Sequence, residues 1–459
     1  MKKAFVVSFE QLPAFLLGCY GHQWIETPNF DRLASMSVVF DQHFANDLTT
    51  RNNSFPWWTG QTIPGTGGSD ANESACFVSR LKTRNVKTTL LLETEAATGR
   101  TADMRAQEPF FAAFDQVETV TGKNGFEISE AETPIARLIQ TALDQLPDWM
   151  AQPEDQLVWI RSEGIPQTPL APEFYATLYL DEVLDQGDEA ESEETIVDEL
   201  PVEPVLTDED LDEFEDELDL AEEEDWEELI RAVVALFQSP EEWAELDDDE
   251  RRMARAVYAG YVTLLDQWLG RFLDQLLEYA EQQSVLLIVT AARGSSELLG
   301  PVRDVENWGL FEETTHVPLL IFDSENDQQG NRRQFLSQPA DLPVTLSAWW
   351  GIAAEELSSG GTDLLALIAD QGGFEEPVIS AASDQAIAIR TSEFYYLKRR
   401  EEQQPSTEEE ALPLQEETAE QLYQKPTDRW DVYEQHSQHP ETVAALRELL
   451  EEKQTGTTS

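Results

Sequence analysis

Cysteine and histidine are scarce in this chain. Its 459 residues include only two cysteines, Cys19 and Cys76, and five histidines that show no metal-ligand spacing. Two cysteines are too few for a disulfide scaffold or a four-cysteine zinc site. The simplest inference is a reducing compartment, and we expect a cytoplasmic protein.

Long apolar runs are also absent. No stretch reaches the roughly 18–20 apolar residues that a membrane span needs. Near the N-terminus, the run AFVVSF is followed by Glu10 and Pro13, with no small-residue cleavage site behind it. Because these features are not those of a signal peptide, the run is predicted to be a buried strand.

Positive charge is the third deficit. The chain has 91 acidic residues against 30 lysines and arginines, a formal net charge of −61. Nucleic acids and anionic membranes are bound largely through lysine and arginine, so we expect neither as a partner. The hydrophobic content is 41%, with 12 Trp and 21 Phe, which is enough for a real core and excludes disorder throughout.

The negative charge is concentrated in one stretch. Residues 181–250 contain 33 acidic residues and a single basic one, Arg231. Large apolar residues recur at three- and four-residue spacings at 211–218 and 226–237, which predicts two acidic amphipathic helices. We interpret the stretch as a solubilising acidic insertion. The alternative is an arm that binds a basic protein partner.

Elsewhere, short apolar runs alternate with helical patterns. Buried strands are predicted at 4–9, 88–92, 157–160, 285–290 and 317–322, and a long amphipathic helix at 256–282. This alternation is typical of an α/β domain with a largely parallel sheet, which we place at 1–375. A hairpin of AIAIR and EFYYLKRR, followed by a helix at 441–453, predicts a small α+β subdomain at 376–459. The Trp57-Trp58 pair is predicted to lie in the core, or alternatively to line a pocket.

Family motifs follow several of these elements. The chain contains SFEQLPAFLLGCYG at 8–21, TPNFDRL at 27–33, VFD at 39–41, LDQWLGR at 265–271, TAARG at 290–294, FEETTHVPL at 311–319, DLPVTL at 341–346 and QLYQKPTDRWD at 421–431. In this order, they resemble stretches of the sulfatases, members of the alkaline phosphatase superfamily. The resemblance implies that family's α/β fold over nearly the whole chain.

The resemblance also implies a chemistry. Sulfatases cleave sulfate esters with a divalent cation, usually calcium, and a Cys or Ser in C/S-x-P-x-R that is oxidised to formylglycine. A hard cation wants about six or more oxygen ligands. In this chain the first metal aspartate falls on Glu10 and its neighbouring ligand on Gln11. The second metal strand ends in Ala292 and Arg293, which cannot ligate a cation.

The remaining catalytic positions also depart from the family pattern. The nucleophile position falls on Thr50 and the arginine of its motif on Ser54. Glu93 and Glu95 replace a lysine and a histidine, and Asn307 replaces a late lysine. Carboxylates at these places would repel a sulfate, and a threonine does not yield formylglycine by the usual route.

Three functions remain open at this point. The first is a catalytically inactive, sulfatase-like protein that needs no cofactor and acts in binding or regulation, with a small-molecule ligand that the sequence does not identify. The second is an active sulfuric- or phosphoric-ester hydrolase that uses Thr50 as nucleophile and Glu10 as a remnant ligand for calcium or another divalent cation. The third is an interaction protein that acts through the acidic insertion. For the first function, we expect a salt bridge between Glu10 and Arg293 in the vacated metal site, because a buried charge needs a partner.

Overall fold

The computed structural model describes residues 1–46, 48, 55–60, 76–95, 109–166, 169–180, 248–295, 309–326, 328–352, 360–369, 379–383, 385–400 and 419–455. The chain forms two compact units. Unit 1 comprises Met1–Lys123, Pro134–Gly164 and Leu265–Ser459, and unit 2 comprises Asn124–Thr133 and Ile165–Leu264.

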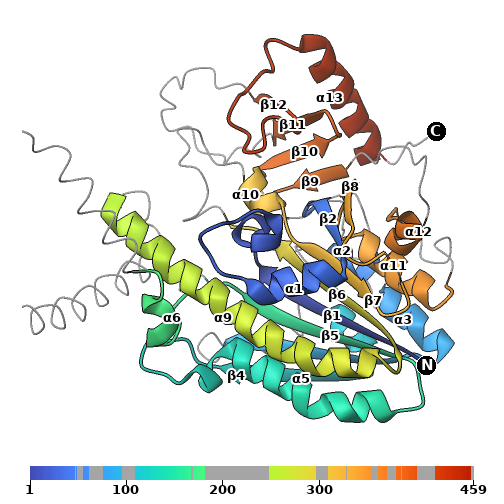
Figure 1. Ribbon diagram of the computed structural model, residues 1–459. Helices are drawn as coiled ribbons and strands as arrows, with labels where there is room; N and C mark the ends of the chain where they lie inside the picture. The colour runs from blue at the N-terminus through green and yellow to red at the C-terminus, as the bar shows by residue number, and fades with distance from the viewer. Residues whose placement is uncertain are drawn as a thin grey trace, which may run out of the picture. The chain divides into compact units, whose positions relative to one another are not determined.

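An eight-stranded sheet forms the centre of unit 1 (Figure 1). Its spatial order is β4 (Gln116–Gly122), β3 (Lys87–Glu95), β5 (Gln156–Gly164), β1 (Lys2–Gln11), β6 (Ser284–Arg293), β7 (Leu319–Asp323), β2 (Val38–His43) and β8 (Arg332–Ser337). Among these strands, β7 pairs antiparallel with both of its neighbours, and the other pairings are parallel. The predicted α/β class with a largely parallel sheet is confirmed, and the five predicted strands all belong to this sheet.

Alternation along β1 separates the two faces of the sheet. Phe5 contacts Trp149 and Phe272, from helices α5 (Pro134–Ala151) and α9 (Asp248–Ala280), at ring distances of 6.2 and 5.9 Å. Ala4 and Val6 point the other way, into a cluster of buried apolar side chains. The first face is thus covered by α5 and the second half of α9. The latter confirms the helix predicted at 256–282.

The opposite face carries an aromatic core. Trp57 and Trp58 in α2 (Phe55–Thr59) are fully buried and lie 5.8 and 4.7 Å from the ring of Trp159 in β5. The predicted core position of the tryptophan pair is therefore confirmed. Other helices of unit 1 are α1 (Pro28–Met36), α3 (Phe77–Leu81), α10 (Glu312–Thr315), α11 (Asp341–Trp349) and α12 (Leu364–Ala369).

A small antiparallel sheet follows in the order β12 (Glu420–Gln424), β11 (Phe394–Arg399), β10 (Ala386–Arg390) and β9 (Ile379–Ala382). The predicted hairpin is the β10–β11 pair. Helix α13 (Pro440–Thr455) packs on this sheet through Val443, Leu446 and Leu450, as Figure 1 shows. The C-terminal sheet and helix are confirmed, whereas the domain boundary at 375 stays a prediction.

In unit 2, helix α6 (Glu173–Thr177) packs closely on the first half of α9. A Cβ at Gly260 would lie 1.7 Å from the carbonyl oxygen of Tyr175, so only glycine allows this approach. Apart from the start of α9, the acidic insertion lies outside the described residues, and its helices stay a prediction.

Candidate functional site

The carboxyl ends of four neighbouring strands bring most of the predicted site residues together. In the register of the sheet, Gln11 in β1 is opposite both Gly164 in β5 and Arg293 in β6. Glu10 precedes Gln11, and Glu93 lies at the same end of β3. In open α/β sheets this edge is where ligands bind, so it is the candidate active site.

The main feature of this edge is a buried ion pair. Arg161, near the end of β5, donates from Nη2 to Oε2 of Glu10 at 2.6 Å. The side chains of Arg161 and Glu10 are only 4% and 10% exposed. The guanidinium also lies 5.8 Å from the centre of the Phe111 ring, a cation–π contact. In a buried pair of this kind, each charge offsets much of the cost of burying the other.

The salt bridge expected between Glu10 and Arg293 is wrong. Both residues are described, and no ion pair joins them within the described part of the chain. The reason is the period of two along a strand. Arg161 is paired with Ser8, two residues before Glu10, and therefore points to the same face as Glu10, whereas Arg293 is paired with Gln11 and points to the other.

Glu93 forms a second buried contact at this edge. Ser162 donates from Oγ to Oε2 of Glu93 at 2.6 Å, and the same hydroxyl accepts from the backbone N–H of Gly164 at 3.0 Å. The Glu93 residue is only 3% exposed. A carboxylate is thus built into the place where the family resemblance expects a lysine.

The other predicted residues have mixed outcomes. Ala292 is 1% exposed and belongs to the aromatic core cluster. Thr50, Ser54 and Asn307 lie outside the described residues, as does the side chain of Glu95. Their predicted roles stay predictions.

Comparison with known proteins places the chain in a family. The Sulfatase family model matches residues 2–352. The chain belongs to the sulfatase family. A 109-residue stretch is 33% identical to the multifunctional alkaline phosphatase superfamily protein PehA of Trinickia caryophylli, covering 24% of this chain and 21% of that protein. The matched stretch thus spans about a fifth of that relative.

Solved structures share the fold of this sulfatase-family protein. A phosphonate monoester hydrolase of Agrobacterium radiobacter matches with a TM-score of 0.67 at 16% identity, over 99% of this chain and 96% of that one. The phosphonate monoester hydrolase SpPMH of Silicibacter pomeroyi matches with a TM-score of 0.66 at 14% identity, over 100% and 96%. BT4656, solved with D-glucosamine-2-N,6-O-disulfate, matches with a TM-score of 0.65 at 13% identity, over 98% and 97%. At these identities the likeness establishes the fold alone.

The donors at this edge do not fit the divalent cation that the family usually uses. Within the described ranges, no three His, Cys, Asp or Glu side chains are grouped so that they could hold a metal ion. The carboxylate of Glu10 is engaged by Arg161, and Ala292 has no ligating atom. A hard cation needs several oxygen ligands, and the guanidinium bonded to Glu10 repels it.

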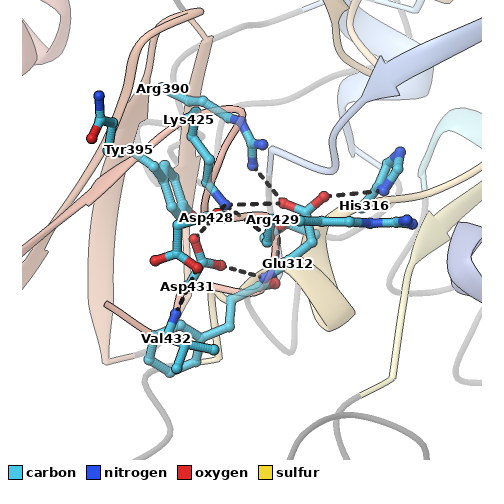
Figure 2. Close-up of polar contacts among 12 residues, drawn as sticks. Glu312, His316, Arg390, Tyr395, Lys425, Asp428, Arg429, Asp431 and Val432 are labelled. Carbon is cyan, nitrogen blue, oxygen red and sulfur yellow. Dashed lines mark hydrogen bonds and ion pairs between the residues drawn. The ribbon is translucent and has the colours of Figure 1, made fainter. Parts of the chain in front are cut away.

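Unit 1 of this sulfatase-family protein contains a second buried polar centre, which the sequence analysis missed. It is shown in Figure 2. Arg390, at the end of β10, donates to Oε2 of Glu312 at 2.9 Å, and Lys425 lies 3.5 Å from the same oxygen. Lys425 also pairs with Asp431 at 2.6 Å, and Asp431 accepts from the backbone N–H of Glu312 at 2.8 Å. This Glu312 cluster, with His316 on its other side, ties the small sheet to the segment before β7.

The Glu312 cluster balances two cations against two carboxylates. Burial alone would raise the pKa of Glu312, but Arg390, together with His316 and Lys425, holds it well below its usual range. Burial raises the pKa of Asp431 to about 6, against the lowering effect of Lys425. The arrangement resembles an active site in composition. Its charged side chains are at most 7% exposed, however, so its role is structural.

His43 gives a prediction for pH dependence. It is fully buried, its Nδ1 lies 2.9 Å from Oγ of Ser337, and burial, reinforced by His316, lowers its pKa to about 3. Between pH 6.5 and pH 3, His43 becomes protonated in the unfolded chain but stays neutral in the folded chain. The His43 contribution to stability is therefore present above pH 6.5 and is lost as the pH falls toward 3.

The measurement compares urea unfolding of the wild type and of His43→Gln between pH 7 and pH 4. The free energy of unfolding of the wild type is expected to fall more steeply, by up to about 1.4 kcal/mol per pH unit. Parallel curves for the two proteins would mean that folding does not lower the pKa of His43. The glutamine still offers Ser337 a polar partner but does not titrate. The difference between the two pH slopes therefore reports the protonation of His43.

In the portion of the chain that the structure describes, no helix is both long and apolar enough to cross a membrane.

Proposed function

We propose that this sulfatase-family protein is catalytically inactive and that its fold serves binding or regulation. The observation that carries the proposal is the Glu10–Arg161 ion pair at the edge where the family resemblance expects a metal aspartate. A guanidinium supplies positive charge to Glu10 but offers no open coordination position, so it cannot polarise an ester or activate a nucleophile as a metal does.

The electrostatics of the same edge support this proposal. Esters of sulfate and phosphate are anions whose transition states need nearby positive charge. Here Glu93 is buried where the family resemblance places a lysine, and Arg161 is already neutralised by Glu10. The described residues thus favour a remodelled cleft over a substrate site for an oxyanion.

The test is an assay of the purified full chain with aryl sulfate, aryl phosphate and phosphonate monoester substrates, each with added Ca²⁺, Mg²⁺, Mn²⁺ or Zn²⁺. We expect no turnover above the background of the buffer, and no difference between the wild type and Thr50→Ala. Metal-dependent turnover that Thr50→Ala abolishes would establish the alternative, an active hydrolase with an altered site.

The third hypothesis concerns the acidic insertion and is independent of the cleft. Acidic side chains at the density found in 181–250 favour a basic protein partner. Deletion of 186–238 is expected to remove such a partner in a pull-down if the insertion is the functional element. Retention of every partner by the deletion variant would refute this hypothesis.

A further inference from the structure

Unit 2 contains a cavity of about 400 Å³, and none of its lining residues belongs to the candidate active site. Two short segments line it, the loop that follows β4 and the start of α6. Its lining includes three aromatic residues and three glutamates: Phe126, Phe174, Tyr175, Glu127, Glu130 and Glu173. All of these residues belong to unit 2, so the cavity is complete within that unit.

The walls of this cavity are held by backbone hydrogen bonds. The N–H of Glu173 donates to the carbonyl oxygen of Phe126 at 3.1 Å, and the N–H of Gly125 donates to that of Leu170 at 3.1 Å. The loop then closes with a capping box, in which Ser129 and Glu132 exchange side-chain and backbone hydrogen bonds. A cavity fixed in this way loses little conformational freedom when a ligand enters.

One wall of the cavity exposes an aromatic ring to solvent. Phe174 is 67% exposed, and its ring meets the buried Tyr175 edge-on at 5.1 Å and 85°. An exposed aromatic side chain that lines a cavity offers a ligand a large apolar contact area.

Charge decides which ligand suits this cavity. The segments 124–133 and 165–180 contain four glutamates and neither lysine nor arginine. Anionic ligands are therefore repelled. Within the described residues, the three lining glutamates do not form a group that could hold a metal ion. An organic cation, by contrast, is attracted both by the carboxylates and by the face of an aromatic ring.

We propose that this cavity binds a lysine or arginine side chain from a basic segment of a partner protein. The charged end of such a side chain would lie over the ring of Phe174, within reach of Glu127 and Glu173. The acidic insertion of this chain is a poor occupant, because its 33 acidic residues would be repelled by the same glutamates. The proposal does not depend on the loss of catalysis.

The experiment uses the full chain and a fluorescein-labelled decapeptide in which three lysines are separated by glycine and serine. Binding is followed by fluorescence anisotropy at physiological salt, where diffuse attraction to the acidic surface is screened. The same peptide with acetylated lysines is the control ligand. We expect the lysine peptide to bind and the acetylated peptide to show no saturable binding.

Three variants distinguish peptide binding in the cavity from general attraction of the peptide to the acidic surface. Phe174→Ala leaves the charge unchanged and is expected to weaken binding about three- to fivefold, as for loss of a cation–π contact. Glu173→Gln is expected to weaken binding to a similar degree. Glu448→Gln, at an exposed position of α13 in unit 1, makes the same charge change as Glu173→Gln and is expected to have no measurable effect.

Two results would overturn the proposal. One is the absence of saturable binding of the lysine peptide to the wild type. The other is unchanged binding by Phe174→Ala together with equal weakening by Glu173→Gln and Glu448→Gln, which would show that the acidic surface as a whole attracts the peptide. Because Phe174 and Glu173 are exposed, their replacement should leave the fold intact, and circular dichroism checks this.

Discussion

Replacement of Lys425 by methionine is expected to lower the free energy of unfolding by about 3–5 kcal/mol. The methionine fills a similar volume but removes the positive charge that faces Asp431 at 2.6 Å and Glu312 at 3.5 Å. Asp431 would lose the cation that pairs with it at 2.6 Å, whereas Glu312 would keep Arg390 and His316. The loss is measured by urea unfolding at pH 7, followed by circular dichroism.

The matched control for this change is Lys398→Met. Lys398 is paired with Glu451 at 3.6 Å, and the two side chains are 35% and 60% exposed. An exposed pair of this kind contributes less than about 1 kcal/mol. Equal losses for the two variants would contradict the assignment of the Glu312 cluster as the contact that holds the small sheet in place.

Replacement of Arg161 by methionine is the second change with a large expected effect. It leaves the carboxylate of Glu10 buried without its cation, and the free energy of unfolding is expected to fall by about 3–5 kcal/mol. Arg293→Met is the control, since Arg293 ends the adjacent strand and is half-buried, with no ion-pair partner among the described residues. We expect the control to change stability by less than about 1 kcal/mol.

A double variant makes this test sharper. When both members of a buried pair are replaced by apolar side chains, stability is often regained. Glu10→Leu with Arg161→Met is therefore expected to recover most of the loss caused by Arg161→Met alone. If the losses in unfolding free energy of the two single variants instead add up in the double variant, Glu10 and Arg161 do not stabilise one another. The proposal that Arg161 replaces the metal would then be wrong.

Most of the buried part of the fold could be predicted from the sequence, but the interior strand β2 was not among the predicted strands, because its apolar run at 38–40 is short. Strands β1, β3, β5, β6 and β7 are central and apolar, so short hydrophobic runs indicated all of them. Strands β4 and β8 lie at the two edges of the sheet, where β4 has a single buried residue, Val120. Their polar sequences are not distinguishable from loops, because an edge strand faces water along much of its length.

The site could be predicted only as far as the strand ends. Glu10 and Arg293 do end neighbouring strands, but a shift of one residue in register turns a side chain to the opposite face. The sequence contains no measure of that register. One signal for Arg161 was available, because it is a charged residue that directly follows the buried apolar run at 157–160.

The Glu312 cluster could not be predicted for a different reason. Glu312 and Lys425 lie in the motifs at 311–319 and 421–431, but neither motif shows that their side chains meet each other and Arg390. Only the packing of the small sheet against α10 brings them together. Long-range polar contacts of this kind have no local pattern, whereas buried strands do.

The central claim is that Arg161 takes the place of the metal beside Glu10. The most direct measurement is anomalous scattering from crystals of the full chain soaked with Mn²⁺ or Zn²⁺. We expect no anomalous peak at the carboxylate of Glu10, with the guanidinium of Arg161 still bonded to it. A peak at that carboxylate, with Arg161 turned away and further oxygen ligands around the ion, would show that Arg161 does not replace the metal.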